Sequence, residues 1–176
     1  RRRHPGLRIS VVGDGWWSQR LQTVADALGV TDIVDFHGFV DEKTKHGVYA
    51  SSWVLALPSL KEGWGIVVME AATHAVPSVA YRQAGGVAES IVHGETGMLV
   101  DGEVEDYAST LGALLEDAAW RARLGDQARK RAEEFTWAAT AKAFAAVLSD
   151  VSTRVSRVRV VPAPSGHVEH HVETTI

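Results

Sequence analysis

The sequence has 176 residues, of which 45% are hydrophobic and 23% are charged, enough to bury one sizeable core and little more. Its formal net charge of -4 argues against nucleic acid as the main partner, because contacts to phosphates favour a basic surface; an anionic small ligand is compatible with it. Because the chain has no cysteine, it can form neither a disulfide nor a thiolate metal site.

Short apolar runs alternate with helical patterns in the amino-terminal part of the chain. The run at residues 7–12 ends at Gly13 and predicts a buried strand followed by a tight turn. The helical pattern that follows ends at Gly29, a residue that favours the end of a helix. Further runs predict strands at 32–37, 53–57, 77–81 and 98–100, with helices between them at 41–50, 65–75 and 87–92. This order predicts an α/β fold, a doubly wound, Rossmann-like parallel sheet covered by helices on both faces.

The carboxy-terminal part is different. From residue 105 apolar side chains recur at helical spacing as far as Leu148, which predicts three packing helices. Past residue 150 the chain becomes polar and contains a proline-rich stretch at 162–166, which predicts a flexible tail. We therefore expect a basic amino-terminal stub (1–6), one α/β domain (7–150) and a tail (151–176).

The candidate binding loops follow from this topology. In a doubly wound sheet, ligands bind outside the carboxyl ends of the strands. The loops that begin there span residues 13–17, 38–40, 59–65 and 82–86, and glycine is frequent in them. Glycine lets the backbone come close to a ligand, so these loops are where we expect binding.

The loop before the predicted helix at 65–75 is the most informative. It carries two glycines, so its amides from Gly63 to Ile66 would point to the ligand from the positive end of a helix, which suits a phosphate. Glu62 and Glu70 lie eight residues apart, close to two helical turns, and could face the same cleft. A carboxylate accepts hydrogen bonds from neighbouring hydroxyls, so one glutamate could hold a ribose and the other a hexose.

Several motifs in one order resemble those of the family-4 retaining glycosyltransferases, whose architecture of two Rossmann-like lobes is called GT-B. The resemblance covers residues 7–144. It lies in the strand with its Gly-Asp-Gly turn (13–15), the Val-Asp-Phe-His-Gly-Phe-Val stretch (34–40), the Glu-Gly-Trp-Gly segment that leads to a second glutamate (62–70), the Val-Pro-Ser-Val-Ala strand (76–80), and a Gly-Gly loop followed by Gly-Glu-Thr-Gly (85–97). Trp64 stands where such enzymes more often carry Phe, and Ala75 where Gly commonly precedes the next strand.

The resemblance implies roles for individual residues. Glu70 would hold the ribose hydroxyls, and Glu62 would contact the transferred sugar near its reacting carbon as an orienting and electrostatic residue rather than a general base. The segment that binds the donor would also include Gly63 and Trp64, with the amides of Gly65 and Ile66 on the distal phosphate. The remaining contacts would come from the nucleobase edge at Phe39 and Val40, the cleft lining at Gly13 and Gly15, and the pocket floor at Gly85 and Gly86.

The function implied is that of the carboxy-terminal, donor-binding half of a retaining glycosyltransferase, which moves a hexose from a nucleotide-diphosphate sugar to an acceptor hydroxyl. UDP-, GDP- and ADP-hexoses remain open as donors, and no metal or other cofactor is expected. An amino-terminal lobe would hold the acceptor, and the family's upstream Arg and Lys that neutralise the diphosphate have no match before Leu7. We therefore expect the chain to be incomplete and inactive alone, and cytoplasmic, with peripheral contact to the inner face of the membrane as the alternative.

Other functions are weaker interpretations of the same residues. A nucleotide-sugar-binding module without transfer activity, or a GT-B-like epimerase or hydrolase, would keep the same donor site. The glycines at 13 and 15 lack the third glycine of a dinucleotide fingerprint. Histidines in the predicted tail have no acidic or cysteine partner at useful spacing: His167, His170 and His171. Basic residues on a predicted helix are expected to form a solvated face, with anionic lipid as the alternative: Arg121, Arg123, Arg129, Lys130 and Arg131.

Overall fold

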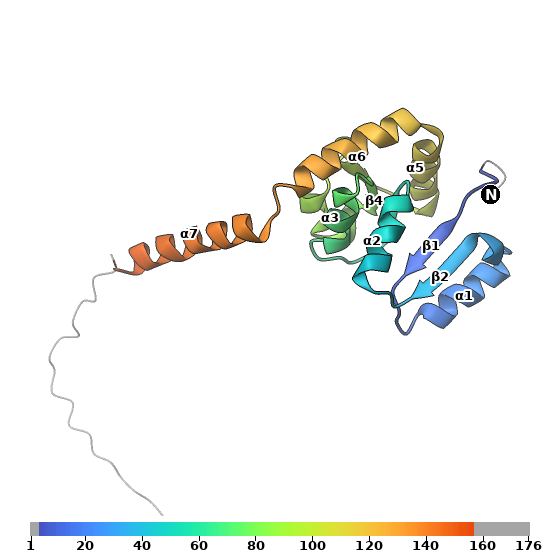
Figure 1. Cartoon of the computed structure of the whole chain (residues 1–176), viewed down its shortest axis with the longest axis horizontal. Coiled ribbons are helices and arrows are strands. Elements are labelled where there is room, and N and C mark those ends of the chain that lie inside the picture. The colour runs from blue at the N-terminus through green and yellow to red at the C-terminus, as the bar shows by residue number, and fades with distance from the viewer. Residues whose placement is uncertain (1–3, 157–176) are drawn as a thin grey trace, which may run out of the picture. The chain divides into compact units, whose positions relative to one another are not determined.

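The computed structural model of the chain describes residues 4–156. The chain divides into two compact units, Arg1–Phe135 and Thr136–Ile176, which are described separately below (Figure 1). The predicted tail lies mostly outside the described residues, as do its three histidines.

The first unit opens with a parallel pair of strands. Strand β1 (Ile9–Val12) pairs with β2 (Val34–Gly38), and α1 (Ser18–Ala27) and the short 3-10 helix η1 (Thr31–Ile33) connect them. As predicted, Gly29 ends the first helix, and its φ of 62° is a left-handed conformation that suits glycine.

A second, three-stranded ladder follows in the order β3-β4-β5, again with all neighbours parallel. Its strands are β3 (Leu55–Leu57), β4 (Ser78–Tyr81) and β5 (Gly97–Val100). The helices of this part are α2 (Glu42–Ser51), α3 (Ile66–Thr73), the 3-10 helix η2 (Arg82–Ala84), α4 (Val87–Ser90), α5 (Val104–Glu116) and α6 (Ala118–Ala132). The predicted α/β class with parallel strands is confirmed.

The sheet differs from the prediction in one respect, because it comes in two pieces. No ladder joins β1 to β3 in residues 4–156, so each of these strands has one edge without a partner strand. The strand predicted to be buried at residues 7–12 is largely exposed: Ile9 and Val12 retain 42% and 37% of their accessible surface. That prediction was wrong because β1 has only one neighbouring strand, whereas the apolar run had suggested a strand enclosed by the sheet.

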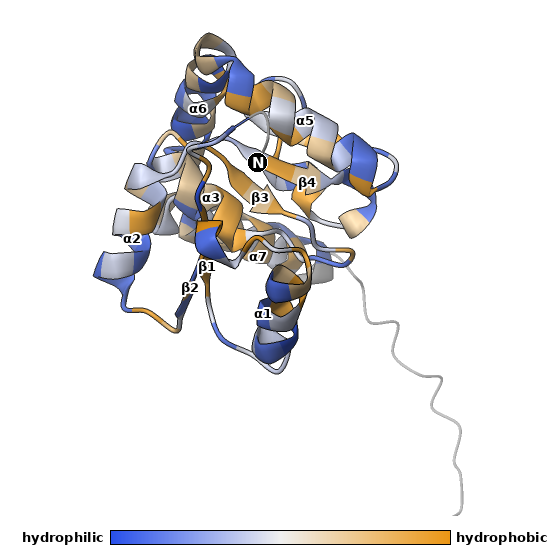
Figure 2. Cartoon of the chain, turned by 90° about the vertical axis from the view of Figure 1, so that its right-hand side faces the viewer, coloured by the Kyte–Doolittle hydropathy of each residue, from blue (hydrophilic) through white to orange (hydrophobic). Residues whose placement is uncertain are grey.

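The core of the first unit lies around β4, all of whose residues are buried. Val79 and Ala80 pack with Leu99 of β5, Leu114 of α5 and Leu124 of α6. Figure 2 shows hydrophobic residues concentrated on β3, β4 and α3. The buried hydroxyl of Tyr107 donates a hydrogen bond of 2.7 Å to the carbonyl of Val79, which ties α5 to the central strand.

Helix α3 packs against α6 through a close backbone contact. A side chain at Gly125 of α6 would collide with the carbonyl of Ala75, just beyond the end of α3. Ala75 itself has a φ of 56°, which explains why glycine commonly stands at this position in the resembling sequences. Buried alanines complete the contact: Ala72, Ala128 and Ala132.

The second unit contains α7 (Trp137–Ser156), which continues six residues beyond the predicted start of the tail at 151. Thr136 caps its first turn by accepting a hydrogen bond of 3.1 Å from the amide of Ala139. The apolar side chains Phe144, Val147 and Leu148 are exposed. The domain boundary at residue 150 stays a prediction. None of the helices in residues 4–156 combines the length and apolarity needed to cross a membrane.

Candidate functional site

The loops after β1 and β2 meet at the carboxyl ends of these strands. The amide of Gly13 donates a hydrogen bond of 2.8 Å to the carbonyl of Gly38, and both glycines have positive φ angles, 112° and 62°. Together with Gly15 they line a hollow of about 630 Å³ between the strand ends and α1. The structure thus brings the predicted cleft-lining glycines of the first loop beside the start of the second.

Asp14 fixes the shape of the first loop. Its carboxylate accepts hydrogen bonds from the hydroxyl of Ser18 at 2.8 Å and from the amide of Gly15 at 2.7 Å. The bond from Ser18, and after it the bond from Gly15, lowers the pKa of Asp14. The carboxylate therefore stays ionised and keeps the loop closed on the start of α1 at neutral pH.

Phe39 and Val40, the predicted edge for a nucleobase, follow β2 directly. Phe39 is 87% exposed, while Val40 is half-buried. The indole rings of Trp16 and Trp17 lie 5.2 Å apart at the first loop, and Trp16 is 90% exposed. This end of β1 and β2 therefore presents aromatic surface to solvent, which suits the stacking of a flat ring.

A second group of predicted residues gathers at the carboxyl ends of β3 and β4. The amide of Glu62 donates to the carbonyl of Ala84 at 2.6 Å, and Glu62 and Gly85 form a parallel bridge. A Cβ atom on Gly85 would lie 2.7 Å from the Glu62 carbonyl oxygen. On Gly86 it would lie 2.7 Å from the carbonyl oxygen of Gly63. Both glycines are therefore required where the two loops touch backbone to backbone.

The loop held by this backbone contact leads directly into α3. Gly65, the N-cap, has a φ of 76°, and a Cβ atom there would crowd Val87 at 3.2 Å. Within residues 4–156 the amides of Gly65 and Ile66 have no hydrogen-bond acceptor, as is usual for the first turn of a helix. The Ile66 side chain is 69% exposed, so this end of α3 opens to solvent.

Two side chains of the same loop, Trp64 and Glu62, make different contacts. Trp64 packs against Phe135 with ring centroids 4.9 Å apart. Glu62 is half-buried, and its carboxylate accepts a hydrogen bond of 3.1 Å from the amide of Gly63. The indole therefore fixes the loop to the body of the unit, while the Glu62 carboxylate keeps lone pairs for a ligand.

Glu70 lies in the second turn of α3 and faces α2. Its Oε1 accepts a hydrogen bond of 2.9 Å from the ammonium of Lys45, and its Oε2 accepts one of 3.1 Å from the hydroxyl of Tyr49. The bond to Glu70, followed by the bond to Glu42, raises the pKa of Lys45. Burial, followed by the bond to Glu70, raises the pKa of Tyr49 to about 12. Sequence reasoning missed both partners, although their i, i+4 spacing on a predicted helix was the available signal.

The predicted basic face of α6 is not uniform. Arg131 donates to the carbonyls of Glu89 at 2.6 Å and Ser90 at 3.2 Å, which fixes the end of α4. Arg121 donates to the carbonyl of Leu114 at 2.6 Å, and its guanidinium lies 4.3 Å from the centroid of the Trp53 ring. Two of the five basic residues therefore serve internal contacts, which leaves fewer charges for a lipid surface.

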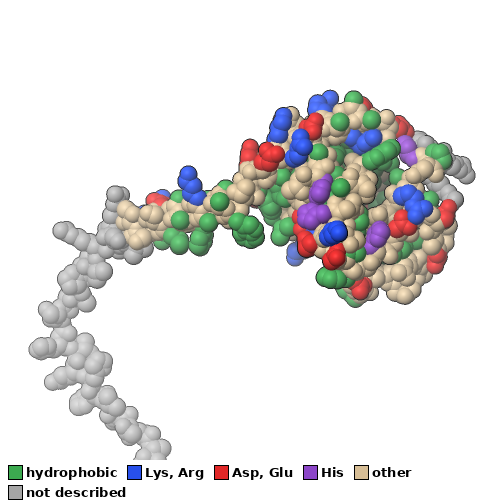
Figure 3. Space-filling view, in the orientation of Figure 1, with side chains coloured by type: hydrophobic (Ala, Val, Ile, Leu, Met, Phe, Trp, Pro, Cys, Tyr) green, Lys and Arg blue, Asp and Glu red, His purple; other side chains and the backbone are tan. Residues whose placement is uncertain are grey.

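No group of three or more histidine, cysteine or acidic side chains within residues 4–156 is arranged to hold a metal ion. His46 and His74 form a pair, with 2.8 Å between Nδ1 of the first and Nε2 of the second. Figure 3 shows histidine, acidic and basic side chains gathered on this face over α2.

Parallel strands, covering helices and glycine loops at the strand ends define the Rossmann-like lobe of the GT-B glycosyltransferases. The model of the family described as "Glycosyl transferases group 1" matches residues 1–131. The chain belongs to this family. A D-inositol 3-phosphate glycosyltransferase of Corynebacterium jeikeium is 35% identical over 150 residues, which are 81% of this chain and 36% of the relative. The chain spans about a third of the length of the first inositol-phosphate glycosyltransferases that it matches.

Two solved structures extend the likeness to three dimensions. A sucrose-phosphate synthase from Thermosynechococcus elongatus superposes with a TM-score of 0.75 at 26% identity, over 84% of this chain and 39% of that protein. HepE of Anabaena, solved in complex with UDP-glucose, gives a TM-score of 0.73 at 28% identity, over 83% of this chain and 42% of that protein. The fold of this chain is therefore shared with these two solved structures.

Proposed function

We propose that the chain is the carboxy-terminal, donor-binding half of a retaining family-4 glycosyltransferase that transfers a hexose from a nucleotide-diphosphate sugar. The observation that carries this proposal is the start of α3, where the amides of Gly65 and Ile66, which have no acceptor within residues 4–156, lie in the sequence between two glutamates at 62 and 70. Amides at a helix start bind phosphate, and carboxylates bind sugar hydroxyls, so one short segment offers groups for each part of the donor.

The donor would lie across the strand ends. The diphosphate would meet the amides of Gly65 and Ile66, with the ribose on Glu70 and the hexose beside Glu62. The nucleobase would lie against Phe39 and Val40, close to the glycines of the first loop. Gly85 and Gly86 would act indirectly, because their close backbone contact with Glu62 and Gly63 positions the Glu62 loop.

Glu62 would act on the reacting sugar by electrostatics. When the bond between the sugar and the phosphate breaks, positive charge develops at the anomeric carbon and negative charge on the leaving phosphate. A fixed carboxylate near that carbon stabilises the positive charge, and the helix amides stabilise the negative charge. Retention would follow if the acceptor hydroxyl attacks from the face that the phosphate leaves, with Glu62 orienting the sugar.

The relatives support a nucleotide sugar as the donor and a separate lobe for the acceptor. HepE was solved with UDP-glucose, which supports a nucleotide sugar as donor. The matched region is about a third of these curated relatives, which are named D-inositol 3-phosphate glycosyltransferases. An acceptor lobe in a longer protein would complete the cleft.

Calorimetric titration of the 176-residue chain with UDP, GDP and ADP, and with their hexose conjugates, tests the proposal. We expect one nucleotide to bind, with Glu70→Ala weakening that nucleotide at least tenfold, the loss of hydrogen bonds to a charged group. Glu62→Ala should leave the nucleotide unaffected and remove the additional affinity of the sugar conjugate.

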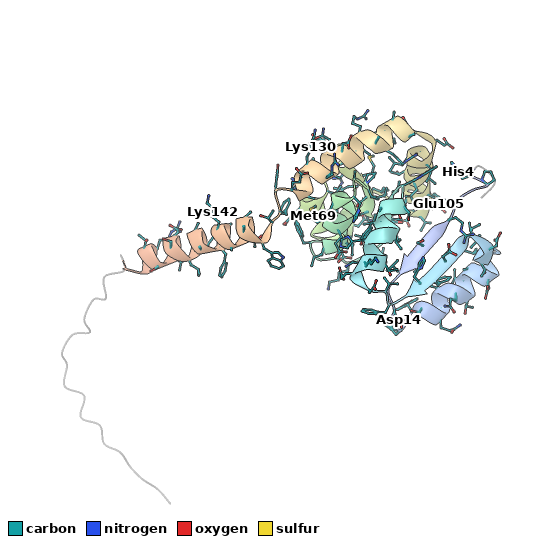
Figure 4. The ribbon with its side chains drawn as sticks, viewed as in Figure 1. His4, Asp14, Met69, Glu105, Lys130 and Lys142 are labelled. Carbon is teal, nitrogen blue, oxygen red and sulfur yellow. The ribbon has the colours of Figure 1, made fainter. Side chains whose placement is uncertain are left out.

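Glu105→Ala is the matched control, because this exposed glutamate lies in the first turn of α5 and should leave every affinity unchanged (Figure 4). Binding of no nucleotide at millimolar concentration would contradict the proposal. Release of free sugar from the bound donor without an acceptor would favour a hydrolase with the same site.

A further inference from the structure

Both carboxylate oxygens of Glu70 are engaged by neighbouring side chains of α2. Lys45 donates to Oε1 at 2.9 Å and Tyr49 donates to Oε2 at 3.1 Å. The Glu70 side chain is 25% exposed and that of Lys45 is 21% exposed, so the group lies between the two helices rather than in bulk solvent. Lys45 and Tyr49 are four residues apart and therefore project from the same face of α2.

The two donors are themselves held in place. Lys45 also contacts the carboxylate of Glu42 at 3.0 Å, so its ammonium lies between two acidic groups. The Tyr49 ring stacks against the ring of His74 at a centroid distance of 6.0 Å and an angle of 24°. His74 is in turn hydrogen-bonded to His46 of α2. The positions of the ammonium and the hydroxyl are therefore fixed by contacts that do not involve Glu70.

A carboxylate held in this way can still accept further hydrogen bonds. Its two oxygens offer about four lone-pair positions, and Lys45 and Tyr49 use one on each oxygen. One position remains on each oxygen, which matches two neighbouring hydroxyls of a ribose. The pKa of Tyr49 is raised to about 12, so its hydroxyl keeps its proton and remains a hydrogen-bond donor throughout the neutral range.

We propose that Tyr49 and Lys45 are positioning residues that hold the Glu70 carboxylate in the orientation in which it accepts the ribose hydroxyls of the donor nucleotide. The inference rests on the proposed function, since it assigns a role to the two side chains that donate hydrogen bonds to the proposed ribose-binding residue, Glu70. It extends the nucleotide site from α3 to α2, a helix outside the Glu62-to-Glu70 segment. In this role neither residue would touch the nucleotide, and each would act only through Glu70.

Comparing a nucleotide with its 2′-deoxy form tests this role. The chain and its variants Tyr49→Phe and Lys45→Met are titrated with UDP, GDP and ADP and with the corresponding 2′-deoxynucleotides. We expect the nucleotide that binds to lose about tenfold in affinity in each variant, as for a hydrogen bond to a charged group. The 2′-deoxy form lacks one of the hydroxyls concerned and should lose clearly less, about threefold or under.

Matched controls exclude a general loss of structure. Lys43→Met changes an exposed lysine on the same helix, and Tyr107→Phe removes a hydroxyl from a tyrosine of α5. Both should bind like the unmodified chain at a temperature below their melting transitions. Lys45→Arg keeps a cationic donor and should recover most of the affinity that Lys45→Met loses.

The outcomes separate this inference from the proposed function. If the unmodified chain prefers the ribonucleotide and Glu70→Ala abolishes that preference, but Tyr49→Phe and Lys45→Met retain it, the inference is wrong and the proposed function stands. Equal losses for both nucleotides in the two variants would also overturn it, because they would indicate a structural role. If the unmodified chain binds no nucleotide, both are overturned.

Discussion

Ala75 shows how one backbone conformation can oppose the preference of its residue. Its φ of 56° places it in the left-handed region, which costs a residue with a Cβ atom about 1–2 kcal/mol. The chain is held there because the amide of Val76 donates to the carbonyl of Ala71 at 3.1 Å and because α6 packs on the Ala75 carbonyl through Gly125. Tertiary packing therefore maintains a conformation that the residue alone disfavours.

Ala75→Gly should consequently stabilise the protein. Glycine removes the Cβ penalty but has more freedom in the unfolded chain, so we expect a net gain of about 0.5–1 kcal/mol in the free energy of unfolding. Urea denaturation followed by circular dichroism measures the change. The control is Ala71→Gly inside α3, which should destabilise by about 1 kcal/mol or more because this alanine is also fully buried, and a loss of stability in both variants would contradict the argument.

At the scale of elements, one buried hydrogen bond joins α5 to β4 in addition to the apolar packing between them. The rings of Tyr107 and Tyr81 pack at 4.9 Å, and the Tyr107 hydroxyl reaches the carbonyl of Val79. Tyr107→Phe keeps the ring and removes the donor, which leaves a buried carbonyl without this partner. We expect a loss of about 1–2 kcal/mol in the free energy of unfolding, measured by urea denaturation.

Tyr81→Phe provides the comparison for that prediction. Tyr81 lies beside Tyr107 and is equally buried, and its hydroxyl makes no hydrogen bond to protein atoms of residues 4–156. The variant should therefore change stability less than Tyr107→Phe. Equal effects would mean that the rings, and not the bond to Val79, attach the helix.

The elements themselves could largely be predicted from the sequence. The strands and α-helices of the first unit were indicated by the spacing of their apolar residues, and the end of α1 at Gly29 followed from glycine alone. The two 3-10 helices, η1 and η2, were not predicted. The division of the sheet could not be predicted, because pairing between β1 and β3 depends on long-range geometry that no local pattern contains. Burial of β1 was mispredicted for the same reason, since an apolar run carries no information about its neighbours.

In the candidate site, the glycine positions could be predicted from the sequence, but the side-chain partners of Glu70 could not. Glycines at 65, 85 and 86 were found by position, and the structure supplies the reason, a positive φ or a backbone contact at each. The partners of Glu70 were missed because Lys45 and Tyr49 become neighbours of α3 only through the packing of two helices. Their residue types are common on solvated helices, so spacing alone did not distinguish them.

At the scale of the whole molecule, three groups on α2 and α5 link stability to alkaline pH. The pKa values of Lys45, Tyr49 and Tyr107 are all raised, by the bond to Glu70 for the lysine and by burial for the tyrosines. Above the ordinary pKa values of 10.0 and 10.5 the folded chain therefore keeps protons that the unfolded chain releases. Their contribution to stability is complete below pH 10 and declines as the pH rises through the folded pKa values.

We expect the free energy of unfolding to fall steadily above pH 10 in a series of urea titrations. The decline should be shallower in Tyr49→Phe than in the unmodified chain, because that variant removes one of the linked groups. Lys43→Met, which changes an exposed lysine on the same helix as Tyr49, should keep the original slope. A slope in Tyr49→Phe that equals that of the unmodified chain would show that this tyrosine does not contribute.

The unpaired edges of β1 and β3 have a consequence for handling the chain in solution. A strand with unpaired amides and carbonyls can add a strand from another molecule, and β1 carries the uncharged sequence Ile-Ser-Val-Val without a proline to prevent it. Concentrated samples of the 176-residue chain should therefore self-associate by intermolecular strand addition. A short extended peptide that occupies such an edge would suppress the aggregation and keep the chain monomeric.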